Sequence, residues 1–128
     1  MDALYRDFIL DHYKNPRNFG ELQPHDLEFH DHNPLCGDEL GVHIVVTDGK
    51  VAELRFHGQG CAISQAAASI ASEELIGMPV DDAAELDADW MLEHLGIDIS
   101  PTRRKCALLN LKVLRGAVTG DASWPEGE

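Results

Sequence analysis

The sequence predicts a single α+β domain, in which a small antiparallel sheet of about three strands packs against several helices. Two observations support this class. Two β-branched runs, 40–47 and 50–57, flank the pair Asp48-Gly49, which is the pattern of a β-hairpin. Segments with helical periodicity lie on both sides of this hairpin. A chain of 128 residues is the size of one domain and long enough to bury a hydrophobic core.

The N-terminal part predicts a helix followed by a weak strand. Residues 2–14 place apolar side chains at helical spacing, and the turn-forming segment "NPRNFG" ends that helix. Residues 24–34 are polar and rich in histidine, but Leu27 and Phe29 alternate with polar residues. We therefore expect a possible edge strand here, ahead of the hairpin.

The second half of the chain predicts helices. Residues 63–76 are rich in alanine, begin after glycines and end at Gly77. Residues 80–96 favour one or two short helices. The last helix is expected to begin with Ser100 as its N-cap and Pro101 at its first helical position.

We expect the domain to cover residues 1–120, with a flexible tail over 121–128. The chain carries 23 acidic and 10 basic residues, for a formal charge of −13. Such a balance argues against nucleic acid or an anionic membrane as partner. It suits a basic partner surface, adaptation to high salt, or simply a well-solvated acidic surface. No apolar run approaches the roughly 20 residues of a membrane span. The N-terminus lacks the features of a signal peptide, so we expect a cytoplasmic protein.

The three cysteines all fall near ends of expected elements. Cys36 lies in the turn "NPLCGDEL", Cys61 precedes the alanine-rich helix, and Cys106 is near the start of the last helix. Disulfides are rare in the cytoplasm, so metal or thiol chemistry is the leading interpretation. Three thiolates with the Asp38 carboxylate would suit tetrahedral zinc, or iron with sulfide. Spacing alone leaves a second interpretation open, with one reactive loop cysteine and two buried structural ones.

The segments "NPLCGD", "GQGCAIS" and "RRKCALL" resemble the three cysteine motifs of the U-type iron–sulfur cluster assembly proteins, the IscU/SufU family. The N-terminal "LDHYKNPRNFG" is similar to that family's opening helix and turn, and the resemblance runs over about residues 4–118. It implies the SufE/IscU-like fold. It also implies one site made by Cys36, Asp38, Cys61 and Cys106, which holds zinc in many purified members, and a cysteine desulfurase as partner.

The chain departs from each branch of that family in one respect. Lys105 stands where the IscU branch has a histidine, and Arg103, Lys105 and "GQGCAIS" resemble the SufU branch. The insertion that SufU proteins usually carry between the second and third cysteines is missing. The resemblance therefore leaves two roles open.

The first role is sulfur transfer, as a zinc-dependent sulfurtransferase that accepts persulfide sulfur from the desulfurase. Cys36 is then the expected nucleophile, with Asp38 tuning the metal. Arg103 would hold Asp38 or steer the persulfide, and Lys105 would offset the negative charge of the site. The alternative role is a scaffold, on which a labile iron–sulfur cluster is assembled and passed to apo-proteins. A purely structural zinc domain is a third interpretation.

The histidines are a further set of polar candidates. Those in residues 24–34 follow no metal-ligand spacing and are interpreted as solvated rather than as ligands. Those of the hairpin are expected at the surface. His12 is expected to be packed or capped. The set comprises His25, His30 and His32 in the polar segment and His43 and His57 in the hairpin.

Overall fold

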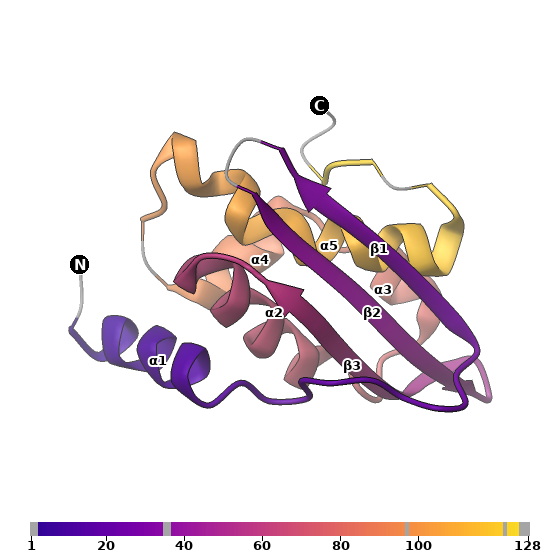
Figure 1. Ribbon diagram of the computed structural model, residues 1–128. Helices are drawn as coiled ribbons and strands as arrows, with labels where there is room; N and C mark the ends of the chain where they lie inside the picture. The colour runs from indigo at the N-terminus through magenta and orange to yellow at the C-terminus, as the bar shows by residue number, and fades with distance from the viewer. Residues whose placement is uncertain (1–2, 35–36, 97, 122, 126–128) are drawn as a thin grey trace.

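A computed structural model describes residues 3–34, 37–96, 98–121 and 123–125 (Figure 1). It confirms the α+β prediction, because three strands form one antiparallel sheet in the order β1-β2-β3 and helices pack on one of its faces. The elements are α1 (Ala3–Lys14), β1 (Leu27–Asn33), β2 (Asp38–Thr47), β3 (Lys50–Gln59), α2 (Ala62–Leu75), α3 (Val80–Ala84), α4 (Ala88–Leu95), the 3-10 turn η1 (Pro101–Arg103) and α5 (Arg104–Thr119).

The hairpin of β2 and β3 forms where the Asp-Gly pair predicts it. Asp48 and Gly49 have positive φ angles of 54° and 75°, as the two-residue turns of hairpins require. Thr47 pairs with Lys50 directly across this turn. The turn residues therefore fix the register that brings the buried faces of both strands together.

β1 is the edge strand that its alternating sequence predicts. It pairs antiparallel with β2, with Leu27 opposite Ile44 and Phe29 opposite Val42. Leu27 and Phe29 pack against the core, while Glu28 between them is exposed. Phe29 lies so close to Gly116 of α5 that a Cβ atom there would meet its ring at 2.6 Å. The inner face of the sheet is therefore the face that meets α5.

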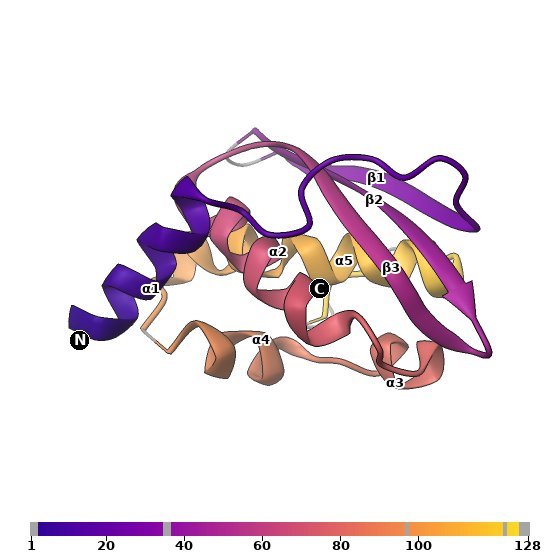
Figure 2. The same ribbon diagram turned by 90° about the horizontal axis from the view of Figure 1, so that it is seen from below.

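The helices form two layers on that inner face. α2 and α5 pack against the sheet, and α3 and α4 lie on the far side of these two helices (Figure 2). Inward side chains of the strands and the apolar stripe of α5 make the core. Its fully buried members include Leu40, Ile44, Leu54, Phe56, Leu75, Met91, Leu108 and Leu111.

We call residues 15–26, which connect α1 to β1, the strap. It starts along the free edge of β3, where Gly20 N–H donates to Phe56 O at 2.7 Å and Phe56 N–H donates to Asn18 O at 2.8 Å. It ends beside β2, where Asp26 N–H donates to Ile44 O at 2.8 Å. The strap therefore crosses the outer face of the sheet, opposite the helices (Figure 2).

A buried polar contact fixes α1 to α2. His12 Nδ1 lies 2.7 Å from Ser69 Oγ, which also accepts the backbone N–H of Arg17 at 2.8 Å. His12 is 1% exposed, which confirms that it is packed. Burial lowers the pKa of His12, so the ring is neutral near pH 7.

The start of the last helix differs from the prediction. Pro101 begins the 3-10 turn η1, and the α-helix itself begins at Arg104. Ser100 makes no side-chain capping bond; its hydroxyl lies 3.2 Å from the hydroxyl of Thr102. The proline starts a helical turn as expected, but that turn has the tighter 3-10 geometry often found at helix termini.

In the part of the chain that the structure describes, no helix combines the length and the apolar character that crossing a membrane requires.

Candidate metal centre

Asp38 begins β2 and is the buried carboxylate of the site. It is 1% exposed, and its Oδ1 accepts the backbone N–H of Cys61 at 2.9 Å. The second oxygen, Oδ2, lies 3.9 Å from Cys61 Sγ. The Asp38 carboxylate therefore links the start of β2 to Cys61, the residue directly before α2.

Cys61 is the N-cap residue of α2 and has extended backbone angles, with φ −71° and ψ 168°. The expected position at the start of the alanine-rich helix is confirmed. Its carbonyl accepts from Gln65 N–H and Ser64 Oγ, both at 3.1 Å, which secures the first turn. Its half-buried thiol therefore lies at the positive end of the helix dipole.

Gly60 lets the Asp38 carboxylate approach the start of α2. A Cβ atom at this position would lie 2.5 Å from Asp38 Oδ1 and 2.5 Å from Ser64 Oγ. Real Cβ atoms do not make such contacts with buried groups without displacing them. The glycine in "GQGCAIS" therefore has a steric role at the site.

Cys106 adds a second sulfur from the first turn of α5. It is the third residue of α5 and is 1% exposed. One ligand atom each from Asp38, Cys61 and Cys106 lie within 4.8 Å of one another. Of the two interpretations that spacing left open, the geometry favours convergence for these three residues. Cys36 lies outside the described residues.

The chemistry of this donor set fits a thiolate-binding metal. Two sulfurs and one carboxylate oxygen come from three different elements, and two of the three residues are buried. Zinc takes sulfur and carboxylate ligands in tetrahedral sites, and iron–sulfur centres are held through cysteine sulfur. Asp38 and Cys61 are also positioned by the protein itself, through the bond from Cys61 N–H.

The basic residues expected near the site lie at the start of the last helix. Arg103 is exposed in η1, and Lys105 is half-buried, with Nζ 4.8 Å from the centre of the Trp124 ring. The same ring lies 5.3 Å from Lys112 Nζ. Sequence reasoning missed Trp124; a tryptophan in a short polar segment was the one available signal that this segment packs.

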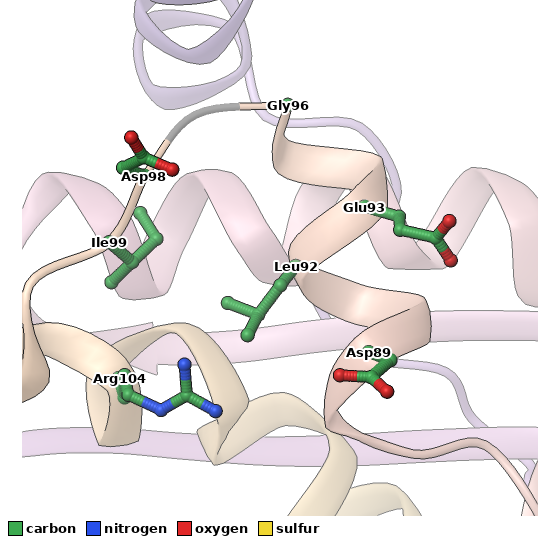
Figure 3. Close-up of a pocket in the computed structure, with 7 residues that line it drawn as sticks. All are labelled: Asp89, Leu92, Glu93, Gly96, Asp98, Ile99 and Arg104. Carbon is green, nitrogen blue, oxygen red and sulfur yellow. The ribbon is translucent and has the colours of Figure 1, made fainter.

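A pocket of about 810 Å³ lies between α4 and residues 98–104 (Figure 3). Leu92 and Ile99 line its apolar part, and carboxylates and one guanidinium lie around them. Its lining comprises Asp89, Leu92, Glu93, Gly96, Asp98, Ile99 and Arg104. Its lining includes none of the three converging residues, although Arg104 is two positions before Cys106 along the chain.

A second group of possible ligands lies on the outer face of the sheet. One atom each from His25, Glu28 and His43 also lie within 4.8 Å of one another. The prediction that His43 lies at the surface is wrong, because the residue lies beneath the strap and is 8% exposed.

Comparisons with known proteins agree with the fold and the motifs. The chain matches the family model of the NifU-like N terminal domain over residues 4–121. It is 34% identical over 135 residues to the zinc-dependent sulfurtransferase SufU of Bacillus subtilis, covering 92% of this chain and 91% of the relative. It is 33% identical to the iron–sulfur cluster assembly scaffold protein IscU of Thermotoga maritima, with 90% and 92% covered.

A solved structure shows the same architecture. The putative iron–sulfur cluster assembly scaffold protein for the SUF system from Fervidobacterium islandicum superposes with a TM-score of 0.76 at 27% identity. The match covers 88% of this chain and 95% of the other.

Proposed function

Because this chain belongs to the NifU-like N-terminal domain family, with relatives of both the SufU and the IscU kind, we propose that it acts in iron–sulfur cluster biogenesis as a zinc-bound sulfur acceptor. In this role it takes persulfide sulfur from a cysteine desulfurase. The observation that carries the proposal is the approach of Asp38, Cys61 and Cys106 to one another, where β2, α2 and α5 begin. The similarity to the SufU of Bacillus subtilis over nearly both chain lengths supports it.

The proposed ligands are Cys36, Asp38, Cys61 and Cys106. Bound zinc would keep the cysteine sulfurs deprotonated at neutral pH. Asp38 is held in place by the N–H of Cys61 and by the space that Gly60 leaves open.

The chemistry proposed for the chain is thiol–persulfide exchange. The thiolate of Cys36 attacks the outer sulfur of the desulfurase persulfide, forming a new S–S bond on Cys36. The S–S bond of the desulfurase breaks, and its cysteine leaves as a thiolate, so no external oxidant or reductant is consumed. Cys36 is assigned from its turn sequence. Arg103, exposed in η1, is available to steer the anionic persulfide, and Lys105 offsets negative charge next to Cys106.

A scaffold role is the second candidate. The sulfurs and the carboxylate would then hold iron and sulfide as cargo to be passed on, with Asp38 as the weak oxygen ligand that keeps the cluster labile. The short segment between Cys61 and Cys106 favours this reading, since it lacks the insertion usual in SufU proteins. The similarity to the IscU of Thermotoga maritima supports it as well.

The turnover of the cognate desulfurase separates the two roles. Alanine release from cysteine is measured with and without the zinc-loaded chain, in the absence of any small dithiol. A sulfur acceptor raises turnover many-fold, and Cys36→Ala abolishes the rise while Thr119→Ala, at the opposite end of α5 from Cys106, preserves it. If turnover is unchanged by the wild-type chain, the acceptor role is wrong and anaerobic cluster transfer is the next assay.

A further inference from the structure

The outer face of the sheet concentrates histidines. Glu28 of β1 lies opposite His43 of β2, and Gly41 lies opposite His57 of β3, so these residues share one face. The strap adds His25, whose ring stacks on that of His43 at 3.9 Å with an interplanar angle of 15°. The group His25, Glu28 and His43 therefore forms where the strap crosses the sheet; we call it the histidine cluster.

The hydrogen bonds of His25 determine its charge. Its Nδ1 lies 2.7 Å from the carbonyl oxygen of Leu22, and its Nε2 lies 2.7 Å from Glu28 Oε1. A carbonyl and a carboxylate only accept hydrogen bonds, so both ring nitrogens must donate. His25 is therefore an imidazolium in this arrangement, and the short distance to Glu28 is that of a charge-assisted bond.

The hydrogen bonds of His43 require the opposite state. Its Nδ1 lies 3.1 Å from the backbone nitrogen of Leu22, which can only donate. His43 is therefore neutral, with its proton on Nε2, and that nitrogen lies 3.9 Å from Glu28 Oε1. Both rings bond to the backbone of Leu22: His25 to its carbonyl oxygen and His43 to its N–H.

This geometry suits a proton rather than a metal ion. Lone pairs of imidazole lie in the ring plane, so two rings stacked nearly parallel do not direct theirs to one point. The Nδ1 of His43 already accepts an N–H, so its Nε2 carries the proton and is not free to bind a cation. The 2.7 Å approach of His25 Nε2 to Glu28 is also shorter than two ligands about 2.0 Å from one tetrahedral ion allow.

The charged groups around the cluster come from every neighbouring element. His57 of β3 packs edge-on to His43 at 4.8 Å, and its Nδ1 lies 3.2 Å from Gly20 O of the strap. The strap also contributes Glu21 and Asp26, β3 contributes Arg55 opposite His43, and β1 contributes Glu28 and His30. The bond to Leu22 O, and then Glu28, raise the pKa of His25. Burial, and then the charges of His25 and His57, lower the pKa of His43.

We propose that His25, Glu28 and His43 form a one-proton clasp that holds the strap on the sheet near neutral pH and releases it when a second proton arrives. A proton on Nδ1 of His43 would point at the N–H of Leu22 and remove that bond. It would also place two cations in stacked rings beside a single carboxylate. Mild acidification therefore opens the strap locally, while the core beneath the sheet stays folded.

The test is a histidine-ring NMR titration of the full-length chain, with hydrogen exchange of the strap amides measured across the same pH range. In the wild type, His25 titrates above and His43 below the ordinary histidine value of about 6.5. Protection of the Leu22 amide falls about fivefold or more as His43 becomes protonated, the equivalent of one lost hydrogen bond. Exchange of core amides in α5 does not change over this range.

Two variants isolate the coupling, and a third is the control. Glu28→Gln removes the counter-charge and lowers the pKa of His25. His25→Gln removes the stacked cation and raises the pKa of His43. His32→Gln removes an exposed histidine from the same strand and changes neither.

Three results would overturn the proposal. One is that the pKa of His25 does not change in Glu28→Gln and the pKa of His43 does not change in His25→Gln. Another is that Leu22 protection does not follow the protonation of His43. The third is a second equivalent of zinc, beyond that taken by the thiols, bound by the wild type at neutral pH and lost in His25→Gln, since the cluster would then be a metal site.

Discussion

The substitution Gly60→Ala tests how tightly the centre is built. The new Cβ would lie 2.5 Å from both Asp38 Oδ1 and Ser64 Oγ, so these atoms must move by roughly 1 Å to reach ordinary contact. Asp38 is buried and bonded to Cys61 N–H, so it cannot move without weakening that bond. Overpacking of this kind costs about 1–3 kcal/mol of unfolding free energy.

The same displacement weakens metal binding. Metal–ligand distances tolerate only about 0.2 Å, and losing a group that orients a ligand typically weakens affinity about 10–100-fold. We therefore expect Gly60→Ala to bind zinc about 10–100-fold more weakly than the wild type, as measured by competition with a chromogenic chelator. Urea unfolding of the same samples measures the change in unfolding free energy.

Gly116→Ala is the matched control for this experiment. Its Cβ would meet the ring of Phe29 at 2.6 Å, a comparable clash between α5 and β1 that involves none of the proposed ligands. It should lower stability and leave zinc affinity unchanged. Wild-type zinc affinity in Gly60→Ala would refute the reasoning, because the Asp38 carboxylate would then not be held where the structure has it.

The remaining predictions concern stability and cluster lifetime. Ser69→Ala removes the partner of buried His12 and should lower the unfolding free energy by about 1–3 kcal/mol; urea unfolding within error of the wild type would contradict this. Burial favours a raised pKa for Asp31, but the bond from Lys112 prevails and lowers it. The stabilisation is therefore present above the ordinary Asp pKa of about 3.9 and is lost as pH falls through the folded value. Asp31→Asn should destabilise at pH 7, and its stability should converge with that of the wild type as the pH falls below the lowered pKa of Asp31. A difference in unfolding free energy that stays constant with pH would refute the pairing. If the scaffold role holds, Asp38→Ala should lengthen the lifetime of an anaerobically assembled cluster, followed by its visible absorbance, and an equal lifetime counts against that role.

Local chemistry made most of the fold predictable. The Asp48-Gly49 pair dictates the hairpin because few other residues accept two successive positive φ angles. The alternation of Leu27 and Phe29 similarly identified β1 despite its polar sequence. The burial pattern of the first helix was harder to predict, since Leu4, one of its apolar residues, is 76% exposed. A helix that covers only part of its neighbour buries only part of its own apolar stripe.

The site and the histidine cluster depend on tertiary geometry that spacing does not contain. Nothing in the positions of Cys61 and Cys106 along the chain states that α2 and α5 begin at the same end of one layer; the motifs suggested it only through resemblance. The burial of His43 was not predictable, because the strap that covers it comes from a segment with no periodicity. A residue's face on a strand can be read from the sequence, but not the loop that crosses that face.

X-ray absorption at the zinc edge of the full-length, zinc-loaded chain tests the central claim most directly. The account predicts one zinc per chain, with sulfur neighbours at about 2.3 Å and one oxygen at about 2.0–2.2 Å. The oxygen contribution should disappear or change in Asp38→Ala. A shell made only of nitrogen and oxygen, or a chain that retains no zinc, would contradict the assignment of the thiols and Asp38 to one metal centre.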